Sequence, residues 1–472
     1  MKKRAIAMGM AAVMGISCLT GCGNGAKSEA PAQNAESQGE AKAQNDSDPQ
    51  AEDGVTEIEF WHSISGELAE KLGEMTENFN NTVGKEKNIK VTTVYQNWPG
   101  TDKLVTVMQA KDIKNHPDLI QIYGENMNIV RDYERMVWVE DYINREDSAV
   151  KKEDLVPNAA EAFSIDGKML GAPLTLSTLL LYYNQDMFDA AGITAPPATI
   201  AEMAEDMEKL TKKEGDTTQV YGLNLCPNSY ELNSWIAGQG EVSYFGDNES
   251  GRKAPMTKVI IDENGTLDNF LTEWDKVIQT GGLKYQVDNM NEEFANQQHA
   301  MVIMSSARIQ IMKGLIGDTF KWSVADLPKV KESDNGGSSV SGGGLFMIDK
   351  DDPKKLEASW EFVQYCLSPE TQLFWSQNTG YVPVNQKTYD LPEMTEFLKN
   401  EPELGTAIAQ IQHSSPKLQE PYYPNAGEIK TVVKEALILF AKGEMSKEET
   451  LKTIVEDCNA AINDYYRANP LD

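Results

Sequence analysis

The chain has 472 residues and a formal net charge of −30, with 73 acidic and 43 basic side chains. A surface this acidic disfavours binding to nucleic acid and to anionic lipid headgroups, because both attract basic patches. The four histidines are scattered, and the five cysteines show no short spacing typical of a metal site. We therefore expect no cofactor and no metal.

The first 21 residues are typical of a secretory signal peptide. Lys2, Lys3 and Arg4 precede an apolar run over residues 5–19, which is too short to span a bilayer. The residues before Cys22 resemble a bacterial lipobox, which implies that the Cys22 thiol is acylated and becomes the mature N-terminus. Two acyl chains on one residue suffice for stable anchoring. The alternative is an ordinary signal peptide followed by a chance cysteine.

Residues 22–54 are predicted to be a lipidated cysteine followed by a disordered tether. Residues 23–54 contain no Ile, Leu, Val, Phe, Tyr or Trp, so this segment cannot bury enough apolar surface to offset the entropy of ordering it. Among the later cysteines, Cys226, Cys366 and Cys458 have apolar neighbours. We expect three buried core thiols there, although one disulfide among them is an alternative.

From residue 55 onward the length favours two domains, since single cores stop growing near about 250–300 residues. The first part of this region alternates strand and helix patterns, which indicates βαβ units, a parallel sheet and an α/β fold. The strand patterns lie at 57–61, 89–95, 117–123 and 170–175, and the helix patterns lie at 67–79 and 102–111.

Polar and aromatic side chains follow the first three predicted strands. They are Trp61, His62 and Ser63 after the first strand, Trp98 after the second, and Glu125 after the third. Ligands of parallel α/β sheets gather beyond the carboxyl ends of the strands. These residues therefore predict a binding site at that edge, with the tryptophans as stacking surfaces for sugar rings.

The second half repeats the pattern. Strands are predicted at 179–184, 300–306 and 342–348, and helices at 199–210, 267–279, 354–366 and 428–440. A Gly/Ser-rich loop over 336–344 lacks the spacing of a P-loop. We interpret this loop, which includes Gly342 and Gly343, as a hinge or a contact made by backbone groups.

Several segments carry a resemblance to a known family. They are FWHSISGEL, PDLIQIYG, YYNQDMFDAAGI, AMVIMSS, GGGLFMI and TGYVPVN, in this order along the chain. The chain resembles the extracellular solute-binding proteins of ATP-binding-cassette (ABC) importers, in their carbohydrate-binding group. Within that group it is most similar to the glycerol-3-phosphate-binding proteins, chiefly through FWHSISGEL.

The resemblance implies a two-lobed periplasmic-binding-protein fold with a ligand cleft between the lobes and a hinge that the chain crosses three times. We expect the crossings near Leu181, Gly344 and Val382. Lobe one would then comprise 55–181 plus 345–380, and lobe two would comprise 182–344 plus 381–472. The implied protein is a monomer whose partners are a small-molecule sugar or polyol and the permease subunits of the importer.

The resemblance also implies ligand positions. Ser177, Ser305 or Ser306, Gly342 and Tyr381 match them, and Trp98 stands where relatives have Tyr. The acid that holds glycerol hydroxyls in relatives is replaced by Gly124, with Glu125 one residue later. The phosphate-binding Arg is matched by Lys430, which lacks the forked geometry of a guanidinium. Arg308 is a second possible source of positive charge.

Other candidates have simple structural alternatives. Tyr230 and Trp235 lie in an expected polar loop and could contact ligand, although Trp is as often a core residue. Glu67 could bind hydroxyls or cap the first helix. Ser305 and Ser306 could cap a helix, a role that is compatible with binding an anion.

The predicted function is capture of an extracellular sugar or oligosaccharide for delivery to a permease. The predicted location is the outer face of the cell membrane, which is the periplasm if the cell has an outer membrane. Binding of glycerol 3-phosphate or a glycerophosphodiester on the same scaffold is the main alternative. A secreted carbohydrate-active enzyme is a further alternative, but no GxSxG motif or distinct carboxylate pair indicates a catalytic site. A peptide or iron-chelate binder would need different groups at the strand ends.

Overall fold

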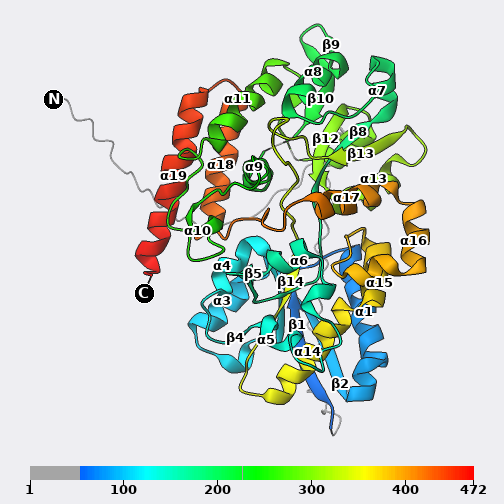
Figure 1. Ribbon diagram of the computed structural model, residues 1–472, viewed down its shortest axis with the longest axis vertical. Coiled ribbons are helices and arrows are strands. Elements are labelled where there is room, and N and C mark those ends of the chain that lie inside the picture. The colour runs from blue at the N-terminus through cyan, green and yellow to red at the C-terminus, as the bar shows by residue number, and fades with distance from the viewer. Residues whose placement is uncertain (1–53, 226, 287, 472) are drawn as a thin grey trace, which may run out of the picture. The chain divides into compact units, whose positions relative to one another are not determined.

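Figure 1 shows the computed structural model of the chain, which describes residues 54–225, 227–286 and 288–471. The predicted signal peptide, Cys22, nearly all of the tether and Cys226 lie outside these residues. Among the helices of the described ranges, none has the length and apolar character needed to cross a membrane.

The first sheet is mixed. Its strand order is β2 (Ile89–Tyr95), β1 (Thr56–His62), β3 (Leu119–Tyr123), β14 (Gly343–Ile348) and β4 (Met136–Val137), and β7 (Ala172–Pro173) also pairs with β14. Strand β1 is parallel to both β2 and β3, whereas β14 is antiparallel to its neighbours. The parallel strands are those that the βαβ pattern predicts.

The second sheet is built the same way. Its order is β11 (Leu283–Lys284), β10 (Thr217–Asn224), β12 (His299–Ser305), β8 (Leu179–Asn184) and β13 (Trp322–Asp326), with β9 (Lys212–Glu214) paired to β10. A separate two-stranded pair consists of β5 (Ser164–Ile165) and β6 (Lys168–Met169).

Helices pack into two apolar cores. The first core includes side chains of α1 (Glu67–Asn81), α3 (Asp102–Gln109), α4 (Met127–Val130), α5 (Val139–Ile143), α6 (Pro157–Ala162), α12 (Met290–Ala295), α13 (Ile309–Ile316), α14 (Pro353–Leu367), α15 (Pro369–Thr379), α16 (Pro392–Lys399) and α17 (Pro402–His413). The second includes side chains of α7 (Gln185–Ala191), α8 (Ile200–Leu210), α9 (Ser229–Ala237), α11 (Thr266–Gln279), α18 (Ala426–Ala441) and α19 (Lys447–Ala468). The short helices α2 (Val83–Lys87) and α10 (Asp247–Ser250) complete the set within the described residues.

Strand β8 separates the two cores. Leu180 and Tyr182 point into the first core, whereas Leu179, Leu181 and Tyr183 point into the second. Successive side chains of a strand face opposite sides of the sheet, so a strand buried on both faces has a continuous apolar sequence. This explains why LLLYYN carries no polar alternation.

The predicted elements match the observed ones closely where the periodicity is long. The pattern at 267–279 is α11, and the pattern at 199–210 is α8 with Thr199 as its N-cap. The pattern at 170–175 shrinks to the two residues of β7. Strands β10 and β13 and helix α19 are among the elements that were not predicted, because their solvent-facing polar residues mask the apolar period.

The first two predicted crossing points lie within two residues of the start of a strand. Leu181 and Gly344 each lie inside a strand, and β8 belongs to the second sheet and β14 to the first over their whole lengths. The chain must therefore pass between sheets before Leu179 and before Gly343. The third crossing, near Val382, remains a prediction; in this segment the Val384 carbonyl accepts from the Val156 N–H at 2.8 Å.

Buried cysteines agree with the expected core thiols for two of the three positions. Cys366 and Cys458 are free and buried, the former in the first core and the latter in the second. Burial raises the pKa of the Cys458 thiol to about 12 and also raises that of Cys366.

Candidate ligand-binding site

A pocket of about 140 Å³ lies at the carboxyl ends of β1, β2 and β3. These ends meet at one edge because β1 runs parallel to both neighbours and His62 is in register with Tyr95. We refer to it as the aromatic pocket. Its lining residues are Ser63, Ile64, Ser65, Leu68, Trp98, Tyr123, Thr175, Trp375 and Tyr381.

Two pairs of rings line the aromatic pocket. The Trp98 and Tyr123 centroids are 4.6 Å apart with the rings tilted by 55°, and those of Trp375 and Tyr381 are 6.3 Å apart and stacked at 18°. Trp98 is 59 % exposed, which is unusual for a large indole and leaves most of its surface to solvent. Burial raises the pKa of the Tyr381 phenol, so this hydroxyl remains a neutral donor. The pocket thus combines aromatic faces with hydroxyl groups.

Polar atoms beside the rings have unused bonding capacity. The Ser63 N–H donates to Gln121 Oε1 at 3.1 Å, but the buried Ser63 hydroxyl and Gln121 Nε2 have no hydrogen-bond partner among the described residues. Buried polar groups without a partner cost stability unless a water or ligand satisfies them. A hydroxylated ligand in the aromatic pocket could supply those partners.

A second, smaller cavity of about 10 Å³ adjoins the first, and we refer to it as the inner cavity. Tyr123 lines the aromatic pocket and the next residue, Gly124, lines the inner cavity. A Cβ on Gly342 would lie 2.0 Å from the Thr175 carbonyl oxygen, so only glycine allows these two backbones to approach. The lining residues of the inner cavity are Gly124, Ala162, Phe163, Arg252, Val340, Gly342, Gln419 and Glu420.

Charged groups converge around the inner cavity. Glu125, just after β3, forms an ion pair with Lys430 of α18. Burial raises the pKa of Glu420 to about 8 and that of Glu231 to about 7, and Lys430 offsets part of both shifts. Three carboxyl groups therefore surround one partly neutralised ammonium.

Arg252 adds a buried positive charge to this cluster, and backbone carbonyls hold it in place. Its guanidinium is buried, donates to the carbonyls of Glu420 (3.1 Å), Glu161 and Ser164 (3.4 Å), and lies 4.2 Å from the centre of the Tyr422 ring. The Tyr422 hydroxyl donates to the Ser164 carbonyl as well, at 3.0 Å. These bonds tie the segment around Glu161 to the segment around Glu420, and they occupy most of the guanidinium donors.

Several predicted site residues are brought together here. Ser63, Trp98 and Tyr381 line the aromatic pocket, Gly342 lines the inner cavity, and Glu125 and Lys430 form their ion pair nearby. Their roles in binding remain predictions.

Other predicted site residues bond to the protein itself. Ser177 is linked to Ser341, and the Ser306 hydroxyl accepts from the Thr178 N–H at 3.2 Å. These bonds use the polar groups that the resemblance assigned to ligand. The remaining three are Ser305, which caps the Ala307 N–H; Gly343, whose N–H donates to Thr175 Oγ1; and Tyr230, whose hydroxyl donates to the Ser339 carbonyl.

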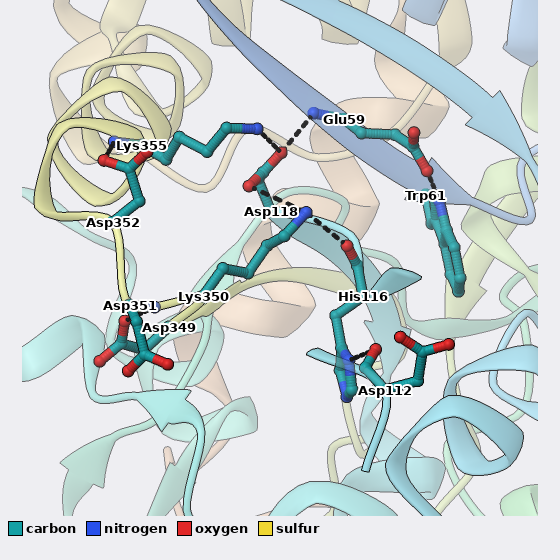
Figure 2. Close-up of polar contacts among 10 residues, drawn as sticks. All are labelled: Glu59, Trp61, Asp112, His116, Asp118, Asp349, Lys350, Asp351, Asp352 and Lys355. Carbon is teal, nitrogen blue, oxygen red and sulfur yellow. Dashed lines mark hydrogen bonds and ion pairs between the residues drawn. The ribbon is translucent and has the colours of Figure 1, made fainter. Parts of the chain in front are cut away.

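The expectation that Trp61 and Trp235 face a ligand is wrong. Trp61 is 1 % exposed, its indole N–H donates to the Glu59 carboxylate (Figure 2), and the Lys103 ammonium lies 3.9 Å from its ring centre. Trp235 is buried in the second core, and its indole N–H donates to the Pro328 carbonyl at 2.9 Å. Both rings satisfy their polar atom internally, as core tryptophans do.

His62, Glu67 and Arg308 also line neither cavity. His62 is buried, and burial lowers its pKa. Glu67 is exposed as the first residue of α1, and no side-chain bond caps that helix. Arg308 is exposed and forms no ion pair with any other described residue.

Five residues at the two cavities were not predicted from the sequence: Tyr123, Thr175, Trp375, Arg252 and Glu420. Tyr123 ends a predicted strand, so its position was a usable signal. Trp375 lies within α15, and Glu420 lies in an irregular segment. No periodicity distinguishes such residues, and only the fold brings them to the strand ends.

A second polar cluster lies at the opposite, amino end of β3 (Figure 2). Asp118 is 1 % exposed, and its Oδ2 accepts from the Glu59 N–H at 2.9 Å and from Lys355 at 3.1 Å. The Lys350 ammonium forms an ion pair with the other carboxylate oxygen at 3.5 Å. Lys350 also donates to the His116 carbonyl at 2.7 Å. These contacts hold strand β3 against the segment after β14 and lie away from both cavities.

Comparisons with known proteins extend these observations. The profile of the family described as "Bacterial extracellular solute-binding protein" matches residues 74–406. The chain is 25 % identical over 435 residues to the sn-glycerol-3-phosphate-binding periplasmic protein UgpB of Yersinia pseudotuberculosis, covering 88 % of this chain and 94 % of that protein.

Two solved structures share the fold. The sugar-binding protein MalE of Xanthomonas citri aligns with a TM-score of 0.72 at 20 % identity, covering 88 % of this chain and 100 % of that chain. UgpB of Mycobacterium tuberculosis in complex with glycerophosphocholine aligns with a TM-score of 0.69 at 17 % identity, covering 89 % and 100 %. The two-lobed solute-binding fold is thereby established.

Proposed function

Because this chain belongs to the bacterial extracellular solute-binding protein family, we propose that it captures a sugar or oligosaccharide outside the cell and delivers it to the permease of an ABC importer. The solute-binding function follows from the family. The identity of the ligand and the residues that hold it are the parts proposed here.

The aromatic pocket is the observation that carries the choice of a sugar. Trp98, Tyr123 and Tyr381 line one small cavity, together with the buried Trp375 that stacks on Tyr381. Aromatic faces give large contact area with few rotors, and they suit the apolar C–H faces of sugar rings. The unpartnered Ser63 hydroxyl and Gln121 amide lie beside them and suit sugar hydroxyls.

Calorimetric titration of the purified full chain with maltose, cellobiose and mannobiose tests this proposal. Trp98→Ala should weaken binding by about tenfold or more, which corresponds to 1.4 kcal/mol, typical of truncating a central aromatic contact. Tyr95→Ala is the matched control, since Tyr95 is 50 % exposed on the neighbouring strand but lines neither cavity. Absence of any heat or thermal shift with these sugars would remove the sugar proposal.

Glycerol 3-phosphate or a glycerophosphodiester is the second candidate, favoured by the curated relatives and by Lys430 beside the inner cavity. Lys430 is already paired with Glu125, so part of its charge is neutralised before a phosphate could bind. Arg308 is the exposed cation that could supply compensation. Calorimetric titration with glycerol 3-phosphate and glycerophosphocholine tests this second candidate. If the protein binds a phosphate group, the affinity should fall with added salt and in the variants Lys430→Met or Arg308→Met.

We infer a binding protein and not an enzyme. The relatives carry names of binding proteins, and the described residues contain no cluster of three or more potential metal ligands. Incubating the protein with maltose and mannobiose and separating the products by chromatography tests this inference. Release of monosaccharides at a rate above that of a buffer control would contradict it.

We further propose that the two sheets mark the two lobes, which close over the ligand by a population shift. The anchor is proposed to be acylated Cys22, at the extracellular face of the cell membrane. Metabolic labelling with palmitate should mark the wild-type protein and not Cys22→Ser. Label on the variant, or none on the wild type, would contradict the anchor.

A further inference from the structure

We propose that Glu420 is a ligand-binding residue whose carboxylate accepts hydrogen bonds from a pair of hydroxyl groups on a neutral sugar. This inference rests on the proposed function and adds a specificity residue from a part of the chain that no motif marks.

The first observation is that the Glu420 side chain makes no bond to another described residue although the residue is largely buried. The residue is 8 % exposed, and its side chain makes no hydrogen bond or ion pair with any other residue that the structure describes. Its backbone carbonyl, by contrast, accepts from Arg252 at 3.1 Å. Both carboxylate oxygens are therefore free to accept hydrogen bonds from a ligand, and a titratable group with a raised pKa in a cavity lining is a candidate for binding.

The second observation is the direction in which this carboxylate points. Glu420 lines the inner cavity together with Gly124 and Gly342. A Cβ at Gly124 would lie 3.6 Å from Glu420 Oε2. The Glu420 carboxylate therefore lies beside the end of β3, next to the place where a side chain at position 124 would begin. Glu420 thus places an acid next to the strand end, although its own segment lies almost 300 positions further along the chain.

The third observation concerns the neighbouring charges. Glu125 after β3 and Glu231 of α9 repel a charge on Glu420, while Lys430 of α18 and Arg252 attract it. Lys430 is paired with Glu125, and Arg252 is held by backbone carbonyls. When Glu420 is ionised, its carboxylate places negative charge in the lining of the inner cavity, which disfavours an anionic group in contact with it.

The adjoining cavities define the ligand class. A ring stacked in the aromatic pocket has its hydroxyl groups at its rim, and the inner cavity begins one residue away, at Gly124. Hydroxyl groups donate to a carboxylate, and such charge-assisted bonds are stronger than neutral ones. A site built for a hydroxyl also rejects an analogue without it, because the buried acceptor is then left unpaired.

The test compares Glu420→Gln with Glu403→Gln. Glu403 is also 8 % exposed but lies on α17 beside Lys313, outside both cavities. The sugar that binds the wild type best among maltose, cellobiose and mannobiose is the probe, and calorimetry is run at pH 6, 7, 8 and 9. We expect Glu420→Gln to weaken binding at pH 8 at least tenfold and Glu403→Gln to leave it unchanged.

The pH profile separates a direct contact from a structural role. Burial raises the pKa of Glu420 to about 8, so the ionised fraction of this carboxyl grows between pH 6 and 8. Only the ionised form accepts hydrogen bonds from both hydroxyls. The affinity of the wild type should therefore rise by up to tenfold per pH unit in this range. Glu420→Gln should flatten this rise, whereas Glu403→Gln should retain it. Glu420→Asp, which keeps the charge but retracts it by one methylene, should retain the rise with weaker binding.

The outcomes distinguish this inference from the proposed function. If the wild type binds none of the three sugars, both the proposed function and the role of Glu420 are contradicted. If the wild type binds a sugar and folded Glu420→Gln binds it with the same affinity and the same pH profile, the proposed role of Glu420 is wrong. The sugar proposal would still stand. Circular dichroism verifies that each variant is folded.

Discussion

Ser177 and Ser341 bind each other through reciprocal backbone hydrogen bonds. The Ser177 N–H donates to the Ser341 carbonyl at 2.8 Å, and the Ser341 N–H donates to the Ser177 carbonyl at 2.9 Å. Ser177 precedes β8 of the second sheet, and Ser341 precedes β14 of the first. The two segments that run between the sheets are therefore joined as a short antiparallel bridge.

Removing one of these backbone bonds tests the bridge. Ser341→Pro deletes the N–H that donates to Ser177 and should lower the free energy of unfolding by about 1–3 kcal/mol, measured by urea denaturation. Ser341→Ala keeps the N–H and is the matched control. Equal stability of the two variants would show that the bridge contributes nothing.

The ion pair between Glu125 and Lys430 should be a weak stabiliser. Its side chains are 19 % and 35 % exposed, so solvent screens part of the attraction. A double-mutant cycle with Glu125→Gln and Lys430→Met should give a coupling free energy of about 0.5–1 kcal/mol at low salt. The coupling should shrink in 1 M NaCl, and a value that salt does not change would argue against an ionic contact.

Glu420 should make stability fall as the pH rises. Its folded pKa of about 8 exceeds the unfolded value of about 4.3, so between these pH values the folded state holds a proton that the unfolded state has lost. This destabilisation begins above about pH 4.3, grows to about pH 8 and then levels off.

Glu420→Gln removes that titration. The variant should be more stable than the wild type at pH 8, by a few kcal/mol, and nearly equal to it at pH 4. Urea unfolding of ligand-free protein at both pH values measures this. A variant less stable than the wild type at pH 8 would mean that the carboxylate has a partner in the protein.

Asp118 should matter for stability and not for ligand affinity. It is buried with two lysines at the amino end of β3, and removing one partner of a buried ion pair costs about 3–5 kcal/mol. Asp118→Asn should approach this loss in urea unfolding. Asp351→Asn, whose carboxylate is 68 % exposed in its pair with Arg135, should change stability by less than about 0.5 kcal/mol.

The sequence by itself determined the α/β class and the edge of the sheet where a ligand would bind. Long apolar periods located α8 and α11, and strand patterns located β1, β2 and β3. Parallel strands bring their carboxyl ends together wherever they form, so the positions of Ser63 and Trp98 followed from local pattern. Family motifs added the two-lobed fold.

Only the tertiary structure decided which side chains at that edge are available. Trp61 and Trp98 both follow strand patterns, yet one indole is 1 % exposed and the other 59 %. The difference arises because burial depends on what packs against a residue from distant segments, and local periodicity carries no information about those segments. For the same reason Glu420, in an irregular segment, became visible only when the fold placed it beside Gly124.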